Sequence, residues 1–358
     1  MLFGATLALC LVGAIMVFSS SAVTAHDQYG SGYHFLIRQL FWLGLGLGAM
    51  MQVMHTDYRR LRRPEFIFPA VFVVLVMLVG VFFLDKSHAT HRWFRLGGAS
   101  LQPSELAKLA VIFYLAWLLE LRRRPEGFGV NDWKRSILPA IAPVLVLVGL
   151  VVMEPDLGTA VEIFLIAVVM LFVAGLDWKY IAGTAVATIP IIYLLIARVP
   201  YRYERMLAFL DPTSDPQGRG FQLIQSLIAV GSGGFTGVGL MESKQKLFYL
   251  PEAHTDFIFA VLCEELGFIG GVTVLALFAF YAWRGMRAAY RAPDEFGRFL
   301  ALGISVMVLS QFLINLGVVL GMLPTKGIPL PFISYGGSSL IVMLLATGVL
   351  LSVSQHAD

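Results

Sequence analysis

The sequence predicts an all-helical membrane protein that crosses the bilayer ten times. Hydrophobic residues make up 58% of its 358 residues, and charged residues only 14%. A soluble domain carries about 25% charged residues, so this chain has too few to solvate an ordinary globular surface. Its apolar residues form continuous runs close to the ~20 residues that a membrane helix needs. A transmembrane barrel would instead alternate apolar and polar residues along each strand.

Polar stretches separate ten apolar runs. The first run is long enough to span and lacks the basic segment of a secretory signal peptide, so we expect a helix there. No tandem repeat or low-complexity tract divides residues 1–358, so we predict a single integral-membrane domain. The expected spans are residues 2–22, 35–54, 66–84, 104–120, 137–153, 158–175, 181–197, 257–283, 299–321 and 332–353.

Basic residues predict how the chain crosses the membrane. They are denser in alternate loops, for example at residues 59–63 and 122–124. Because cytoplasmic loops are enriched in Lys and Arg, we expect both termini in the cytoplasm. The net charge of +3 is too small to indicate nucleic acid binding. Cys10 and Cys263 lie inside apolar runs and are predicted to be buried thiols, not a disulfide or a metal pair.

One outer loop, residues 198–256, is much longer than a connector needs to be and is therefore expected to be functional. Residues 201–210 mix Tyr and Arg with apolar side chains, which predicts a helix at the level of the lipid head groups. Residues 221–230 are apolar and precede several glycines. This pattern predicts an interfacial or re-entrant helix followed by a glycine-rich turn.

Ionisable residues at membrane depth are expensive to bury and therefore indicate function. In the predicted topology, polar clusters from five separate segments share the outer face. We therefore expect a polar cavity that opens toward the outer leaflet. The clusters contain Arg92 and Arg95; Glu105 and Lys108; Glu154 and Asp156; Glu252, His254 and Asp256; and Lys326, Ser334, Tyr335 and Ser338.

Each acidic position also has a plainer interpretation. Asp256 could cap the following helix, or it could be a general base at the mouth of the cavity. Glu105 and Lys108 could form a structural i,i+3 ion pair, or Lys108 could hold an anionic head group. Asp156 could cap the helix after a turn at Pro155.

Glu264 and Glu265 lie about 12 Å below Asp256 along the same helix, at 1.5 Å per residue. A carboxylate at that depth needs a partner or a proton. We therefore expect these two residues to have a structural role.

Several motifs, in order along the whole chain, resemble those of the SEDS family, which comprises RodA, FtsW and SpoVE. The segment 323–327 is more similar to FtsW than to RodA. The motifs are Arg92-Trp-Phe, Gln102-Pro-Ser-Glu-Leu-Ala-Lys108, Glu154-Pro-Asp-Leu-Gly-Thr159, Tyr249 to Gly267, and Gly327 to Ser339.

The resemblance implies a peptidoglycan glycosyltransferase that polymerises lipid II at the outer face of the bacterial cytoplasmic membrane. It places Asp256 on the family's essential aspartate, and Glu105 and Lys108 on its buried pair. The expected partners are lipid II, the lipid-linked nascent glycan, membrane lipid and a class B penicillin-binding protein, a transpeptidase. The predicted substrate-binding residues are Arg92, Glu105, Lys108, Asp156, Arg202, Glu252, His254, Lys326, Ser334, Tyr335 and Ser338.

We expect Asp256 to take the proton of the acceptor hydroxyl while basic side chains neutralise the leaving pyrophosphate. A divalent cation, Mg²⁺ or Mn²⁺, could assist, although the sequence assigns no metal ligands. The alternative function is a lipid II flippase. A flippase would carry polar residues through the full membrane depth, whereas here they gather at the outer face.

The partner's transmembrane helix is expected to contact residues 257–283 and 299–321. The second of these spans carries small residues, which allow helices to approach closely. The alternative is that these small residues pack within the bundle. They are Gly303, Ser305, Ser310, Gly317 and Gly321.

Overall fold

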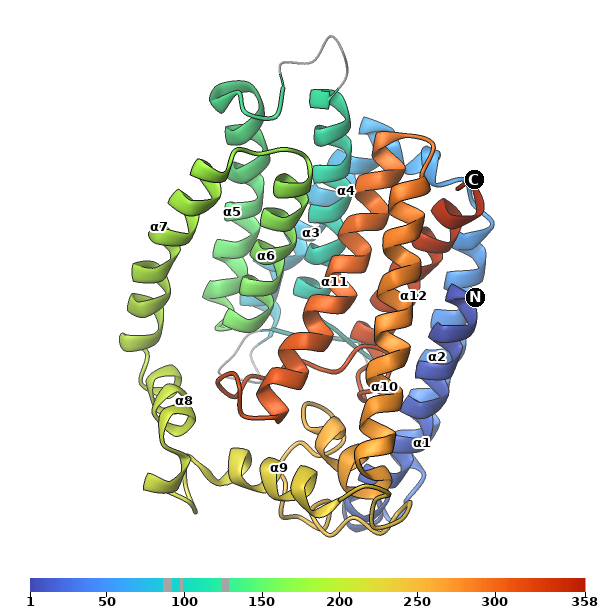
Figure 1. Cartoon of the computed structure of the whole chain (residues 1–358), viewed down its shortest axis with the longest axis vertical. Coiled ribbons are helices and arrows are strands. Elements are labelled where there is room, and N and C mark those ends of the chain that lie inside the picture. Colours follow the sequence, from blue (N-terminus) through green and yellow to red (C-terminus); the bar gives the residue numbers. More distant parts are fainter. Residues whose placement is uncertain (86–91, 97–98, 124–128, 358) are drawn as a thin grey trace.

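The computed structural model describes residues 1–85, 92–96, 99–123 and 129–357 (Figure 1). Each of the ten predicted runs forms a helix, so the helical membrane fold is confirmed. The ten helices are α1 (Leu2–Tyr29), α2 (His34–Met54), α3 (Pro64–Leu84), α4 (Pro103–Arg123), α5 (Leu138–Met153), α6 (Leu157–Val173), α7 (Trp178–Ala197), α10 (Ile258–Arg291), α11 (Glu295–Val319) and α12 (Gly337–Gln355).

Within the described residues, eight of these ten helices lie in segments that are long and apolar enough to cross a membrane by themselves, and α5 does so as part of the continuous helical segment Trp133–Met153. The other two are α4 and α6. Helix α6 has only 17 residues, and α4 contains Glu105, Lys108 and Glu120. Both pack against α11 and against each other. Neighbouring helices therefore cover the polar groups of α4, which allows a less apolar helix to lie at the centre of the bundle.

Helix α7 lies at the edge of the bundle. None of its residues is buried, and it packs mainly on α6 and α8 (Figure 1). By contrast, α11 and α12 are largely buried. Helix α7 therefore belongs to the periphery of the bundle, whereas α11 and α12 lie in its interior.

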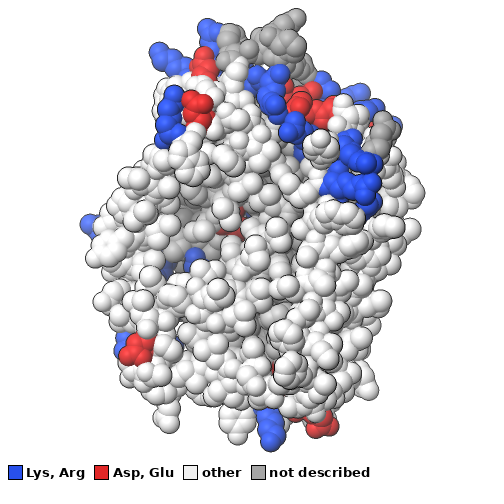
Figure 2. Space-filling model, in the orientation of Figure 1, with Lys and Arg blue, Asp and Glu red and all other residues white. Residues whose placement is uncertain are grey.

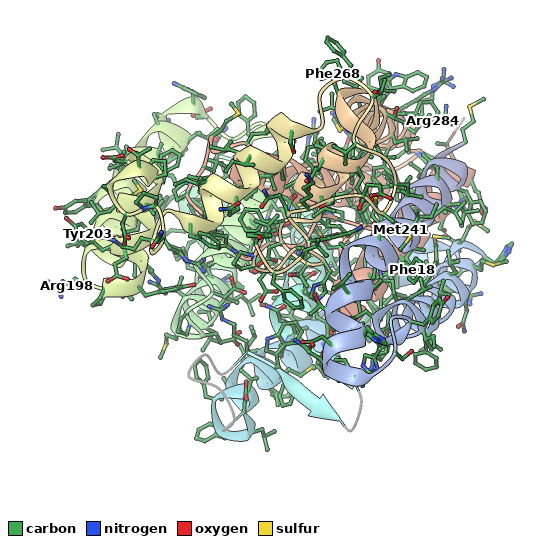
Figure 3. All side chains as sticks on the ribbon, turned by 90° about the horizontal axis from the view of Figure 1, so that it is seen from below. Phe18, Arg198, Tyr203, Met241, Phe268 and Arg284 are labelled. Carbon is green, nitrogen blue, oxygen red and sulfur yellow. The ribbon has the colours of Figure 1, made fainter. Side chains whose placement is uncertain are left out.

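The long outer connection contains α8 (Pro200–Leu210), the short turn η3 (Pro212–Ser214) and α9 (Phe221–Ser232). Both segments that were predicted to be helical, residues 201–210 and 221–230, thus form helices. Figure 3 looks onto this end of the molecule, where α8 lies at the rim with Arg198 and Tyr203 pointing outward. The connection between α3 and α4 contains two short antiparallel strands, β1 (Phe94–Leu96) and β2 (Ala99–Leu101). The remaining elements, η1 (Tyr58–Arg62) and η2 (Trp133–Ile137), lie at the other end.

Helix α1 is longer than predicted, because it continues from residue 22 to Tyr29. The serines that suggested its end lie inside it. Ser20 and Ser21 donate hydrogen bonds to the carbonyl groups of Met16 and Val17, one turn earlier. A serine whose hydroxyl bonds back in this way is compatible with a helix interior.

Glu264 and Glu265 anchor the long outer loop, as their predicted structural role requires. Lys246 Nζ lies 2.8 Å from a Glu265 oxygen, and Ser19 Oγ donates to the same carboxylate at 2.6 Å. The backbone N–H of Lys244 donates to Glu264 at 3.0 Å. These buried contacts fix the loop against α1 and α10 ahead of Asp256.

The small residues of α11 do not form a lipid-facing surface, so that part of the predicted partner contact is wrong. Gly303, Ser305, Ser310 and Gly317 are all buried. A Cβ atom on Gly303 would lie 2.7 Å from Ile112 and 2.9 Å from Met170. These small residues instead let α11 approach neighbouring helices of the same chain.

In the view of Figure 2 most of the visible Lys and Arg atoms gather at one end of the molecule, and a belt with few charged atoms lies below them. We propose that this basic end faces the cytoplasm.

A cysteine at Arg123 should then react with an impermeant thiol reagent only from inside, and one at Ser214 only from outside. Both positions are exposed, whereas Cys10 and Cys263 are buried and should give little background. Labelling of Ser214→Cys from the cytoplasmic side would contradict the topology.

Candidate active site

A cavity of about 500 Å³ lies between α6, α7 and α8 and the segments that contain Asp256 and Lys326. Figure 2 shows a hollow on this side of the molecule in which a few charged atoms are visible. The wall formed by α7 is apolar, with Ile192 and Ile196. The charged lining residues are Arg92, Asp156, Arg202, Arg205, Glu252, Asp256 and Lys326. Four basic and three acidic side chains from separate segments thus meet in one cavity.

Asp256 lines this cavity without capping the helix that follows it. Helix α10 begins after Phe257, and no side chain caps it through a hydrogen bond. The carboxylate lies against Gly327, where an added Cβ atom would be only 2.8 Å from Oδ2. Burial, followed by the nearby charge of Glu252, raises the pKa of Asp256 to about 7. A carboxylate with such a pKa can accept a proton near neutral pH.

The basic side chains are held so that they face the cavity. Arg205 donates to the carbonyl of Thr325 at 3.1 Å and stacks over Tyr201 at 4.3 Å. Arg202 donates to the carbonyl of Leu195 at 3.1 Å. Burial lowers the pKa values of Arg202, Arg205 and Lys326. Cations that are partly stripped of water in this way are suited to receive an anion.

Arg92 and Asp156 form the other side of the cavity. Arg92 Nε donates to the carbonyl of Glu154 at 2.9 Å, and its Nη2 donates to the carbonyl of Pro155. Asp156 caps α6 by accepting from the N–H of Thr159 at 3.2 Å. Asp156 is therefore a helix cap, as its plainer interpretation predicted, and it also lines the cavity. Burial, followed by the Asp156 charge, raises the pKa of Glu154 to about 8.

Lys108 does not line the cavity. Its side chain is fully buried and lies 3.0 Å from Glu105 and 3.4 Å from Glu162. It also donates to Gln311 at 2.6 Å. The predicted Glu105–Lys108 pair is thus present, but it lies in the interior among α4, α6 and α11 rather than where a ligand could reach it.

Four other predicted residues, Ser334, Ser338, His254 and Tyr335, contact neighbouring segments outside the cavity lining. Ser334 Oγ donates to the carbonyl of Thr255, and Ser338 Oγ donates to the carbonyl of Ser100. His254 and Tyr335 pack with Phe35 in an aromatic cluster, with ring centroids 4.8 and 5.0 Å from that of Phe35. These four predicted side chains hold segments together, and the cavity lining does not include them.

The sequence analysis did not select Arg205, Glu162, Gln311 or Asn315 as site residues. Arg205 could have been found because it follows Arg202 by three residues and shares its face of α8. Gln311 and Asn315 are amides four residues apart in an otherwise apolar helix, which is a signal of buried polar contacts. Among the described residues, no group of three or more His, Cys, Asp or Glu side chains is placed to hold a metal ion.

Comparison with known families and proteins gives full-length matches. A family model described as "Cell cycle protein", FTSW_RODA_SPOVE, matches residues 1–358. The "Probable peptidoglycan glycosyltransferase FtsW" of Geobacter metallireducens is 45% identical, over 98% of this chain and 92% of the relative. "Stage V sporulation protein E" of Bacillus subtilis is 43% identical, over 98% and 95%.

Solved structures agree with the fold. A chain from "Structural coordination of polymerization and crosslinking by a peptidoglycan synthase complex" has a TM-score of 0.79 and 34% identity, with 99% of this chain and 96% of that chain covered. The "Rod shape determining protein RodA" of Thermus thermophilus has a TM-score of 0.71 and 29% identity, with 99% and 95% covered.

Proposed function

Because the chain belongs to the FtsW/RodA/SpoVE family of cell cycle proteins, we propose that it is a peptidoglycan glycosyltransferase. Its reaction is the polymerisation of lipid II into glycan strands at the outer face of the bacterial cytoplasmic membrane. The observation that carries the proposal is the cavity in which Asp256 faces four basic side chains. One carboxylate with a pKa near 7 and a set of cations match the two tasks of glycosyl transfer from a diphosphate-linked donor.

In this proposal Asp256 is the general base. Lipid II is the acceptor, and the 4-hydroxyl of its GlcNAc loses a proton to the carboxylate as the oxygen attacks the anomeric carbon of the lipid-linked glycan. The bond from that carbon to the pyrophosphate oxygen breaks, so undecaprenyl pyrophosphate leaves and the configuration inverts. The apolar wall of α7 offers a surface along which the lipid tails could lie.

The basic residues stabilise the negative charge that develops on the leaving pyrophosphate. Arg92, Arg202, Arg205 and Lys326 line the cavity and are suited to this task. Lys108 is too deeply buried for direct contact, so we propose a structural role for it.

The activity is tested directly with purified protein and lipid II in detergent. We expect glycan strands to form, and to form faster or longer when the partner transpeptidase is present. A flippase would instead move lipid II across vesicles without forming strands. The charged cavity lining lies toward one end of the bundle rather than along its whole length, which favours the enzyme over the flippase.

Loss of one cavity cation should impair catalysis. Arg205→Gln removes a charge that faces the cavity, and we expect polymerisation to slow by about 10²-fold, as when one preorganised donor to a developing anion is lost. Arg198→Gln is the matched control, because Arg198 is exposed at the rim and is absent from the cavity lining (Figure 3). Equal rates for both variants, measured by strand formation from lipid II, would contradict a role for Arg205.

The partner is expected to be a class B penicillin-binding protein, and we propose that its transmembrane helix lies against α10. An apolar groove of about 330 Å³ runs between α9, α10 and α11. Phe268 is 63% exposed at the edge of this groove (Figure 3). A single-pass partner can reach only such lipid-facing surfaces. Other groove residues are Val230, Val272, Leu275 and Leu316.

Filling the groove should weaken this complex. Val272→Trp is expected to reduce co-purification of the partner several-fold, because the larger side chain occupies the space of the incoming helix. Val186→Trp, on the exposed face of α7, is the matched control and should not affect it. Full co-purification with a folded Val272→Trp variant would place the partner elsewhere.

A further inference from the structure

The amide side chain of Asn315 joins two of the segments that line the cavity. Asn315 lies on α11 and is 1% exposed in an otherwise apolar stretch. Its Nδ2 donates one hydrogen bond to the carbonyl of Asp256 and a second to the carbonyl of Ile328, each at 2.8 Å. A carboxamide has two N–H donors, and both are used here on main-chain oxygens.

The two carbonyl groups belong to segments that are far apart in the sequence. Asp256 ends the long outer loop, whereas Ile328 lies in the connection that also contains Lys326 and Gly327. Gly327 in turn contacts the Asp256 carboxylate. Asn315 therefore fixes the main chain of Asp256 relative to the surface against which its carboxylate rests.

One turn earlier on α11, Gln311 makes the equivalent contact with the next residue. Its Nε2 donates to the carbonyl of Pro329 at 2.8 Å, and its Oε1 accepts from Lys108 at 2.6 Å. Gln311 therefore links the buried Lys108 cation to residues 328–329, which Asn315 also contacts. Two amide side chains on one face of α11 thus bind the main chain at residues 328–329. Asn315 binds the main chain of Asp256 at the same time, so the position of Asp256 is coupled to that segment.

We propose that Asn315 is a positioning residue, which sets the place of the Asp256 carboxylate in the cavity through the Asp256 main chain. The inference rests on the proposed role of Asp256 as general base. Asn315 does not line the cavity and has no contact with substrate in this proposal. A misplacement of about 1 Å between reacting groups can cost about 10²-fold in rate. Loss of the two Asn315 hydrogen bonds should therefore lower kcat and leave KM nearly unchanged.

The test compares two substitutions with a matched control in the full-length protein. Asn315→Leu removes both donors in a side chain with the same branching and the same number of heavy atoms, although it is somewhat larger. Asn315→Gln keeps both donors but moves them by one methylene, so the buried carbonyls stay satisfied while the register changes. Ser310→Ala is the control, since Ser310 is buried on the same helix and bonds to the carbonyl of Met307 within that helix.

We expect Asn315→Gln to fold with somewhat lower thermal stability, because the extra methylene is buried. It should retain lipid II affinity while kcat falls by about 10- to 100-fold, and Ser310→Ala should match the wild type. Normal kcat in Asn315→Gln would overturn the proposal, as would a rise in KM at constant kcat. Asn315→Leu should lose kcat at least as severely where it folds. If it does not fold, the Asn315→Gln result decides.

Failure of the general-base assignment has a different signature. It would be seen as substantial turnover by Asp256→Asn, whatever the Asn315 variants do. Failure of the positioning role alone would be seen as an inactive Asp256→Asn variant beside a fully active, folded Asn315→Gln variant. Measuring the three variants together separates the two outcomes.

Discussion

We expect Asp256→Asn to slow glycan polymerisation by about 10²- to 10⁴-fold, the usual contribution of a general base. Asn has nearly the same shape as Asp, so the contact with Gly327 is kept while the proton acceptor is lost. The helix after Asp256 has no side-chain cap to lose, so its stability should change little. The rate is measured with purified lipid II, and folding is checked by thermal denaturation of the same preparation.

The pH dependence offers an independent check on the same residue. Since burial raises the pKa of Asp256 to about 7, the carboxyl group is protonated below that pH and cannot accept a proton. The wild-type rate should therefore rise with pH through about 7 and level off above it. Glu252→Gln removes a charge that raises this pKa, so it should move the acid limb to lower pH. A rate with no acid limb, or only a few-fold loss in Asp256→Asn, would leave Asp256 without a catalytic role.

We expect Lys108→Met to destabilise the protein by about 3–5 kcal/mol, which is the cost of breaking a buried ion pair. The substitution leaves Glu105 and Glu162 buried without their cation. Thermal denaturation in detergent measures the loss. Lys179→Met removes an exposed pair with Asp177 and should cause little change.

A second change tests the cause of that loss. Adding Glu162→Gln to Lys108→Met should restore part of the stability, because one of the two orphaned carboxylates is then neutral. If Lys108 instead held pyrophosphate directly, Lys108→Met would keep its stability and lose affinity for lipid II. That outcome would contradict the buried structural role which its contacts indicate.

The sequence alone was sufficient for the helical membrane fold. Each span is a local run of apolar residues, and a helix satisfies its own backbone hydrogen bonds, so its existence does not depend on distant contacts. The resemblance of the motif around Asp256 to a known family pointed to this residue, which lines the cavity. The two helices of the long loop could also be predicted from their own residues.

The tertiary structure alone decided which polar side chains meet in the cavity. Lys108 and Arg205 were both basic residues near the outer face, yet Lys108 points into the interior and Arg205 into the cavity. That difference depends on how each helix is rotated against neighbours more than fifty residues away, as the contacts of Lys108 with Glu162 and Gln311 illustrate. The small residues of α11 turned inward for the same reason. Hydropathy determines where a helix lies in the membrane, whereas packing determines which way its side chains face.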